Sequence, residues 1–164
     1  MTIIINNWKK IIFILSFFAI FFALTAEYIY NLSPCKMCLY QRYPYYFILL
    51  VFVVFYFFKK LSSLWLFIMV ELAILYGLFY SVWHVGIEKK IFSGPEGCSA
   101  FLNKSNSIEN LKDQILKQDV IDCSEVTWII FGFSAATINS ILLLLFLYFN
   151  SIFIIKKFYE KEKI

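Results

Sequence analysis

Four long apolar runs, each bordered by polar or basic residues, dominate the pattern of this 164-residue chain. The runs cover residues 11–30, 39–58, 64–85 and 126–155. A helix needs about 20 predominantly apolar residues to cross a bilayer, so each run is long enough to be one transmembrane span. The last run exceeds that length, and we expect its helix to tilt or to extend beyond the lipid. A cleaved signal peptide is the alternative for the first run, but the apolar stretch is too long for one.

Composition supports the same class of protein. Hydrophobic residues make up 62% of the chain and aromatic residues 21%, and the mean hydropathy is +0.76, whereas soluble domains are about 45 to 50% apolar. We therefore expect an all-α membrane protein, a four-transmembrane-helix bundle in a single domain over residues 1–164. The net charge of +4 is modest, and its lysines border the apolar runs, so no nucleic-acid partner is expected.

Four spans place both termini on one side of the membrane and residues 31–38 and 86–125 on the other. The short segments on the terminal side are rich in lysine, and cytoplasmic segments of membrane proteins carry an excess of such residues. We therefore expect both termini to be cytoplasmic and the other two segments to be exocytoplasmic loops. The lysines on the terminal side are Lys9, Lys10, Lys59, Lys60, Lys156, Lys157, Lys161 and Lys163.

All four cysteines of the chain fall in these two loops: Cys35 and Cys38 in the first, Cys98 and Cys123 in the second. Disulfides persist in an oxidising exocytoplasmic space, so pairing within each loop is expected. A bond across the two-residue gap between Cys35 and Cys38 would constrain little chain entropy, which favours a redox role for that pair. For Cys98 and Cys123, a structural staple of the long loop is the alternative.

The second loop has features suited to presenting a disulfide. Residues 94–97, Gly-Pro-Glu-Gly, predict a turn that places Cys98 on a mobile, exposed tip. Residues 107–120 repeat apolar side chains at helical spacing, with Ser107 as a candidate N-cap, and so predict a short amphipathic helix on the membrane surface. Such a loop could carry a disulfide from a soluble partner toward the bilayer. A helix that merely packs over the bundle is the alternative.

The motif at the first loop also suggests an electron acceptor. The chain contains neither a Gly-x-Gly-x-x-Gly nucleotide fingerprint nor a Cys-x-x-Cys-His haem site. A small bundle can reach a lipid-soluble quinone without a separate domain. Arg42 follows Cys38 by about one helical turn, ~6 Å, where its charge could stabilise a thiolate and bind a quinone oxygen. A snorkelling arginine that anchors the helix is the alternative.

The order Cys35-Lys36-Met37-Cys38-Leu39-Tyr40-Gln41-Arg42 at the start of the second span, followed by Cys98 and Cys123 in the second outer loop, is similar to the DsbB family. This family comprises disulfide-forming membrane oxidoreductases of the bacterial inner membrane. The resemblance covers essentially the whole chain, because helix order, motif position and loop position all correspond.

The resemblance implies a relay of disulfide exchange. A periplasmic DsbA-like thioredoxin-fold protein would attack Cys98, the released Cys123 would attack Cys35, and Cys38 would face a quinone, ubiquinone or menaquinone. It also implies that Arg42 takes part in quinone use.

His84, just before the second outer loop, lies about where the family has a histidine near the quinone. A structural role at the helix end is the alternative for His84.

Two other classes of protein are weaker interpretations. A structural membrane protein could bind zinc through the four cysteines, but their uneven spacing argues against a tetrahedral site, and no metal is expected. A disulfide-stapled structural protein without redox turnover remains an alternative of the same kind. A transporter or scaffold is favoured only by Glu71, and the chain shows no internal repeat. Glu27 and Glu71 are ionisable groups in apolar runs, and we expect Glu71 to be hydrogen-bonded between helices.

Overall fold

The structure, a computed structural model, describes residues 7–58, 63–95, 98, 123–126, 129–130 and 132–162. Its helices are α2 (Trp8–Tyr28), α3 (Lys36–Phe57), α4 (Ser63–Glu88) and α6 (Ala135–Glu162), and its two short strands are β1 (Ile129–Ile130) and β2 (Phe133–Ser134). All four helices are long and apolar enough to cross a membrane. The prediction of a four-helix membrane bundle is therefore confirmed.

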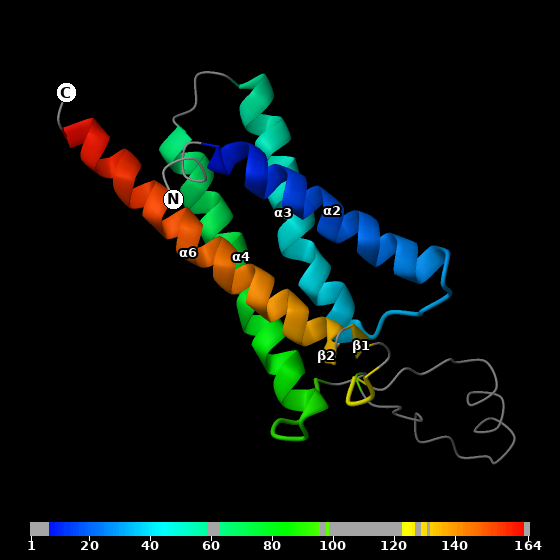
Figure 1. Cartoon of the computed structure of the whole chain (residues 1–164). Coiled ribbons are helices and arrows are strands. Elements are labelled where there is room, and N and C mark those ends of the chain that lie inside the picture. The colour runs from blue at the N-terminus through cyan, green and yellow to red at the C-terminus, as the bar shows by residue number, and fades with distance from the viewer. Residues whose placement is uncertain are drawn as a thin grey trace, which may run out of the picture.

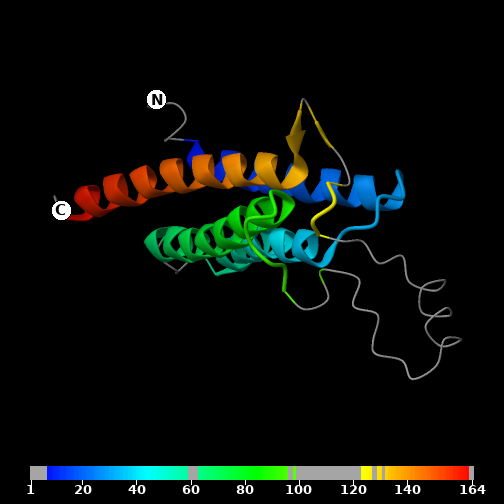
Figure 2. The ribbon, with the colours of Figure 1, turned by 90° about the horizontal axis from the view of Figure 1, so that it is seen from below.

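The helices form a ring in which each packs against its neighbours. α3 contacts α2 and α4, while α6 contacts α4 and α2. Viewed from below, α2 and α6 lie in one layer, and α3 and α4 lie in the other (Figure 2). Both chain ends lie at one end of the bundle, and the two strands lie at the opposite end (Figure 1). This arrangement brings the segments that carry the cysteines to the same end.

α4 packs tightly against α3 and α6 at Gly77. A Cβ atom at Gly77 would lie 2.6 Å from Cγ of Pro44 and 3.1 Å from a methyl group of Leu143. Small residues allow membrane helices to approach closely where the hydrophobic effect does not drive them together. Gly77 therefore gives room to the ring of Pro44, which lies inside α3 because that helix already begins at Lys36.

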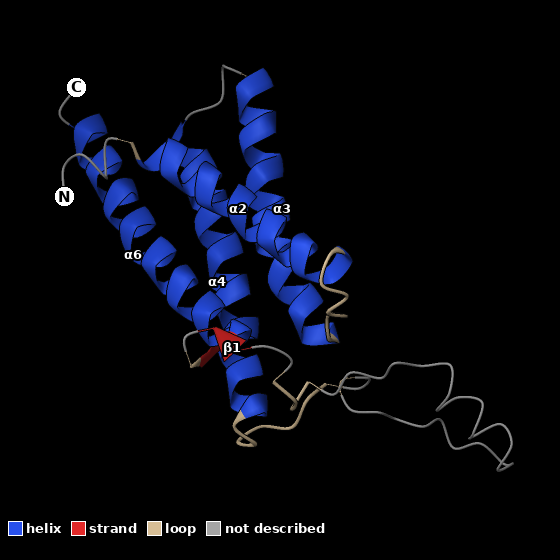
Figure 3. Ribbon diagram, turned by 45° about the vertical axis from the view of Figure 1, so that its right-hand side comes forward, coloured by secondary structure: helices blue, strands red, loops and turns tan. Residues whose placement is uncertain are grey.

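The fourth span begins later than expected. The sequence predicted a helix from residue 126, but the structure has an antiparallel hairpin in which Ile129 pairs with Ser134 (Figure 3). Gly132 has φ +83°, a conformation that favours glycine and is incompatible with a helix. Ser134 then caps α6, because its Oγ accepts a hydrogen bond from the backbone N–H of Thr137 at 3.2 Å. The apolar run at residues 126–155 therefore contains a β-hairpin that its hydropathy does not indicate.

A polar cluster joins three helices near the terminal end of the bundle. Trp8 donates its indole N–H to Asn150, and Asn150 donates to the backbone oxygen of Phe67, each at 3.1 Å. Glu71 accepts hydrogen bonds from Asn150 and Ser151 of α6. The expectation that Glu71 is hydrogen-bonded between helices is confirmed. The amphipathic helix predicted over residues 107–120 lies outside the described residues.

Candidate redox site

Cys35 is both a candidate redox residue and the N-cap of α3. Its backbone is extended, with φ −69° and ψ 166°, and its Sγ accepts the backbone N–H of Cys38 at 3.3 Å. A sulfur here takes the place of the serine or aspartate oxygen that usually satisfies a free amide at a helix start. The Cys-x-x-Cys spacing therefore places Cys38 in the first turn of α3, directly beside the sulfur that caps the helix.

The two thiols of this motif lie together in the dithiol form. Their Sγ atoms are 3.1 Å apart, and neither cysteine is disulfide-bonded in the structure. Cys35 is buried, whereas Cys38 is partly exposed. The bond predicted between them stays a prediction, because the structure holds the reduced pair.

His84 of α4 reaches the same thiols. Its Nε2 lies 3.6 Å from Sγ of Cys35, and its Nδ1 lies 2.7 Å from the amide nitrogen of Gln41. The ring is only 4% exposed. The contacts of His84 are thus to a cysteine and an amide, and its predicted contact with a quinone stays a prediction.

The surroundings of Cys35 favour its ionised form. The hydrogen bond with the side chain of Cys38 is the largest influence, and it holds the pKa of Cys35 well below the usual range of a thiol. Burial acts in the opposite direction, while His84 and the backbone N–H of Cys38 add to the lowering. Ionised thiols are the nucleophiles and leaving groups of disulfide exchange, so Cys35 is poised for that chemistry.

The second pair of cysteines forms a disulfide, as the sequence predicted. Cys98 is bonded to Cys123, and this bond excludes a zinc site that uses all four thiolates. The expected exposed position of Cys98 is wrong, because Cys98 and Cys123 are each 1% exposed. They pack in one buried cluster with Cys35, Met37 and Ile87. Sulfur is apolar enough to be buried readily, and the bundle end provides the apolar surface that covers it.

Arg42 lies one turn beyond Cys38 and is held by α2. Its guanidinium forms an ion pair with Glu27 and donates a second hydrogen bond to the backbone oxygen of Ala23 at 3.4 Å. A guanidinium has five N–H donors, so these two contacts leave donors for a further acceptor. The side chain is 13% exposed. Glu27 was singled out from the sequence, but its pairing with Arg42 was not predicted.

Two amide side chains near the thiols, those of Gln41 and Asn139, connect His84 to α6 through hydrogen bonds. The sequence assigned no function to either residue. Gln41 contacts His84 and accepts a hydrogen bond from Asn139 of α6 at 3.0 Å. Asn139 in turn contacts Tyr45 and Ser81. The signal that could have found them is the presence of amides inside apolar spans, where each polar group needs a partner.

Cys35, Cys38 and His84 each place one possible ligand atom within 4.8 Å of the others. Two sulfurs and an imidazole are donors that bind zinc in other proteins. A ligand must present a lone pair to the ion, so a fit depends on which ring nitrogen of His84 carries hydrogen.

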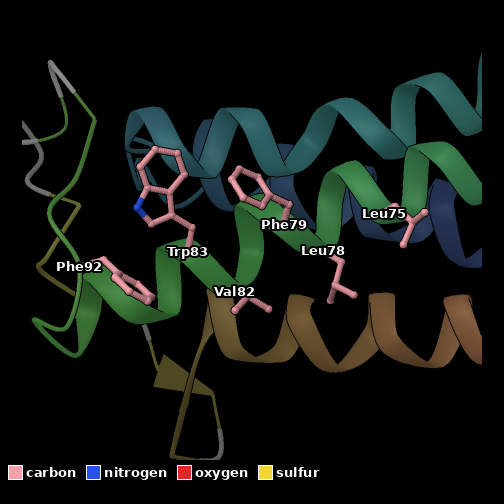
Figure 4. Close-up of a pocket in the computed structure, with 6 residues that line it drawn as sticks. All are labelled: Leu75, Leu78, Phe79, Val82, Trp83 and Phe92. Atoms are coloured by element: carbon pink, nitrogen blue, oxygen red, sulfur yellow. The ribbon is translucent and has the colours of Figure 1, made fainter.

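An apolar groove runs along the outer side of α4, next to the thiols. Trp83 links the two features, because it packs against the cysteine cluster and also lines the groove. Figure 4 shows side chains of α4 along this groove, with Phe92 at one end. The described lining offers hydrocarbon contacts, as suits lipid chains in a membrane. The residues that line it are Leu75, Leu78, Phe79, Val82, Trp83 and Phe92.

Comparison with known proteins agrees with this geometry. The family described as disulfide bond formation protein DsbB matches residues 6–153. The chain belongs to the DsbB family. It is therefore a multi-pass membrane protein with disulfide-forming oxidoreductase activity, as the DsbB description and the four spans indicate.

The chain is also similar to an uncharacterized protein of Rickettsia prowazekii (strain Madrid E). The two are 27% identical over 150 residues, which are 90% of this chain and 85% of that protein. No solved structure matches the chain.

Proposed function

We propose that this DsbB family protein reoxidises a periplasmic DsbA-like thiol oxidase and passes the electrons to a membrane quinone. The observation that carries the proposal is the packing of the Cys98–Cys123 disulfide in one buried cluster with Cys35, beside Cys38. An oxidised pair and a reduced pair in contact are the arrangement that exchange between them requires. Facing the periplasm, this end of the bundle would meet a soluble partner.

The disulfide exchange balances as four successive thiolate attacks. A partner thiolate attacks Cys98, which breaks the Cys98–Cys123 bond and releases Cys123. Cys123 attacks Cys35, which breaks a Cys35–Cys38 bond and releases Cys38. The second partner thiol then attacks the partner's own sulfur in the mixed disulfide and releases Cys98.

Cys98 finally attacks Cys123, which restores the loop disulfide and leaves Cys35 and Cys38 as the dithiol. The proposal is supported by the bonding of the four cysteines in the structure, where the loop pair is oxidised and the motif pair is reduced. A lowered pKa makes Cys35 a good leaving group in the last attack. A pair of electrons and two protons then remain to be removed from the Cys35/Cys38 pair.

A quinone at this site would supply an acceptor for those two electrons and two protons. The residues present fit such a group, because Arg42 has donors for a quinone oxygen and lies one turn from Cys38. Arg42 would orient the quinone and favour negative charge on its oxygen. Glu27 would hold the guanidinium in place, and the membrane spans would keep the site in contact with lipid-soluble molecules.

Burial of the loop disulfide adds a requirement to the first step. Cys98 is 1% exposed, so a partner thiolate cannot reach its sulfur in this conformation. Reaction with the partner therefore requires that Cys98 first leave the cluster with Met37 and Ile87. The partner would meet this requirement by binding preferentially to the protein with Cys98 exposed.

Mixing the purified protein with a reduced DsbA-like protein and a quinone tests the proposal, with quinone reduction followed by absorbance. We expect turnover that requires all four cysteines, and a mixed disulfide through Cys98 that accumulates in the Cys123→Ser variant. Normal turnover by a Cys35→Ser, Cys38→Ser double variant would overturn the mechanism. A structural protein with a loop staple would show no quinone reduction with any variant.

A further inference from the structure

We infer that Gln41 and Asn139 are positioning residues that hold His84 in one tautomer, with hydrogen on Nε2 and directed at Cys35. The inference concerns the state of the His84 ring, and its consequence for disulfide exchange rests on the proposed function. It is carried by a chain of hydrogen bonds that crosses from α6 through α3 to α4.

The chain of hydrogen bonds begins with Asn139, whose contacts determine the orientation of its amide. Its Oδ1 accepts from the hydroxyl of Tyr45, and its Nδ2 donates to Oγ of Ser81 at 3.1 Å. Ser81 can accept this bond because its own hydroxyl has two other acceptors, the backbone oxygen of Ala136 at 3.0 Å and Oγ of Ser140 at 2.8 Å. The Nδ2 group of Asn139 is therefore a donor toward Gln41 as well.

The orientation of Gln41 follows from that of Asn139. Asn139 Nδ2 donates to Oε1 of Gln41 at 3.0 Å, so the other end of this amide, Nε2, faces His84. Nε2 of Gln41 is a donor and lies 2.7 Å from Nδ1 of His84. A neutral imidazole has one donor and one acceptor nitrogen. Nδ1 must therefore be the acceptor, and the ring hydrogen is on Nε2.

This tautomer directs an N–H group at sulfur. Nε2 of His84 is 3.6 Å from Sγ of Cys35, within hydrogen-bonding distance for sulfur. Hydrogen bonds to an ionised acceptor are about twice as strong as those between neutral groups. His84 thus favours the thiolate at Cys35 over Cys38. The same hydrogen occupies the lone-pair position that a metal ligand needs, so this geometry fits thiolate stabilisation and not a Cys35–Cys38–His84 metal site.

The tautomer can be measured directly because His84 is the single histidine of the chain. We would label histidine with ¹⁵N, keep Cys35 and Cys38 in the dithiol form, and record ring-nitrogen chemical shifts in detergent. We expect a protonated Nε2 and an unprotonated Nδ1. Hydrogen on Nδ1 in the unaltered protein would overturn the inference, as would a doubly protonated ring at neutral pH.

Two variants test whether the amides set this state. Asn139→Asp replaces the donor by an acceptor, so the Gln41 amide should rotate and move the ring hydrogen toward Nδ1. Gln41→Met removes the donor, so the Nδ1 resonance should lose its hydrogen-bond shift. The matched control is Ser151→Ala on the same helix, because Ser151 donates to Glu71 and contacts neither Ser81 nor Asn139 through its hydroxyl. The control should keep the unaltered spectrum.

The consequence for sulfur is measured by competition within one molecule. After a brief iodoacetamide pulse, trypsin cleaves after Lys36 and separates the peptides that carry Cys35 and Cys38. We expect the ratio of Cys35 to Cys38 labelling to fall about tenfold in Asn139→Asp, where the ring hydrogen leaves Nε2, as loss of one hydrogen bond to a charged group implies. Unchanged spectra in both variants, with an unchanged labelling ratio in Asn139→Asp, would overturn the inference. Neither readout uses partner or quinone, so this failure would leave the proposed function standing.

Discussion

Glu27 of α2 and Arg42 of α3 form an ion pair beside the redox cysteines. The pair joins two helices at the end of the bundle that carries the thiols, and both side chains are largely screened from solvent, at 24% and 13% exposure. Arg42 thus combines a structural contact with the position expected of a quinone-binding residue. The two roles can be separated by measurement.

Replacing Arg42 tests its role toward the quinone. Arg42→Ala removes a charged hydrogen-bond donor, so the apparent KM for quinone should rise about tenfold or more while partner binding stays intact. Quinone reduction at varied quinone concentration measures the change. Arg42→Lys should recover part of the loss, because it keeps the charge but loses the planar geometry. An unchanged quinone dependence in Arg42→Ala would assign the residue to anchoring alone.

A double-mutant cycle measures the contribution of the ion pair to stability. Glu27→Gln and Arg42→Gln should each lower the stability of the bundle, because each leaves a charge without its partner. The double variant should be more stable than the sum of the single losses predicts, with a coupling of about 0.5–3 kcal/mol. Thermal unfolding in detergent provides the data. Additive losses would mean that the pair contributes nothing to stability.

Gly77 should be the glycine least tolerant of substitution in α4. Gly77→Ala places a methyl group against the rigid ring of Pro44, and overpacking of this kind costs about 1–3 kcal/mol. Gly86→Ala is the matched control, since its methyl group would meet the exposed side chain of Phe92, which can move away. We expect a clear drop in the unfolding midpoint for the first variant and little change for the second. Equal midpoints would contradict the packing argument.

Cys35 should remain reactive at a pH where ordinary thiols are protonated. Because its pKa is lowered in the folded protein, the labelling rate of Cys35 should stay nearly constant between about pH 8 and about pH 6. The labelling rate of an unperturbed thiol falls roughly tenfold for each pH unit over that range. The pulse-labelling and trypsin method above gives the rate.

The sign of the linked stability change follows from the same pKa. Because the pKa of Cys35 is lower in the folded protein than in the unfolded chain, ionisation of this thiol stabilises the folded, reduced protein at pH values above the pKa of the unfolded thiol. This contribution is lost as the pH falls toward the pKa that Cys35 has in the folded protein. The oxidised protein, in which Cys35 does not titrate, is the control and should lack this component. A Cys35 labelling rate that falls with pH like that of a free thiol would contradict the prediction.

Glu71 should be required for its hydrogen bonds to α6. Glu71→Leu would remove one of the two acceptors of the Asn150 amide and the acceptor of the Ser151 hydroxyl, and a buried polar group left without its partner costs about 1–3 kcal/mol. Glu71→Gln keeps an acceptor oxygen and should cost much less. Thermal unfolding distinguishes the two. If Glu71→Leu were as stable as Glu71→Gln, the cluster would not hold the helices together.

The number of spans and the end of the bundle that carries the cysteines were predictable from sequence. An apolar run long enough to cross a bilayer is a local property, and counting such runs fixes on which side each loop lies. The Cys35–Cys38 motif at a helix start was predictable for the same reason, as was the pairing of Cys98 with Cys123. The start of α6 was not, because hydropathy cannot distinguish the Ile129–Ser134 hairpin from helix.

Tertiary structure alone decided how side chains from different helices meet. Gln41 and His84 are separated by 43 residues, and Gln41 and Asn139 by 98, so their hydrogen bonds depend on the rotation of each helix about its axis. The same holds for Glu27 with Arg42 and for the burial of Cys98. The sequence by itself determined the spans and the chemistry of the thiols, because these depend on local composition and spacing. Packing determined that the thiolate of Cys35 is stabilised and that the Cys98–Cys123 disulfide is buried, because both depend on distances between helices.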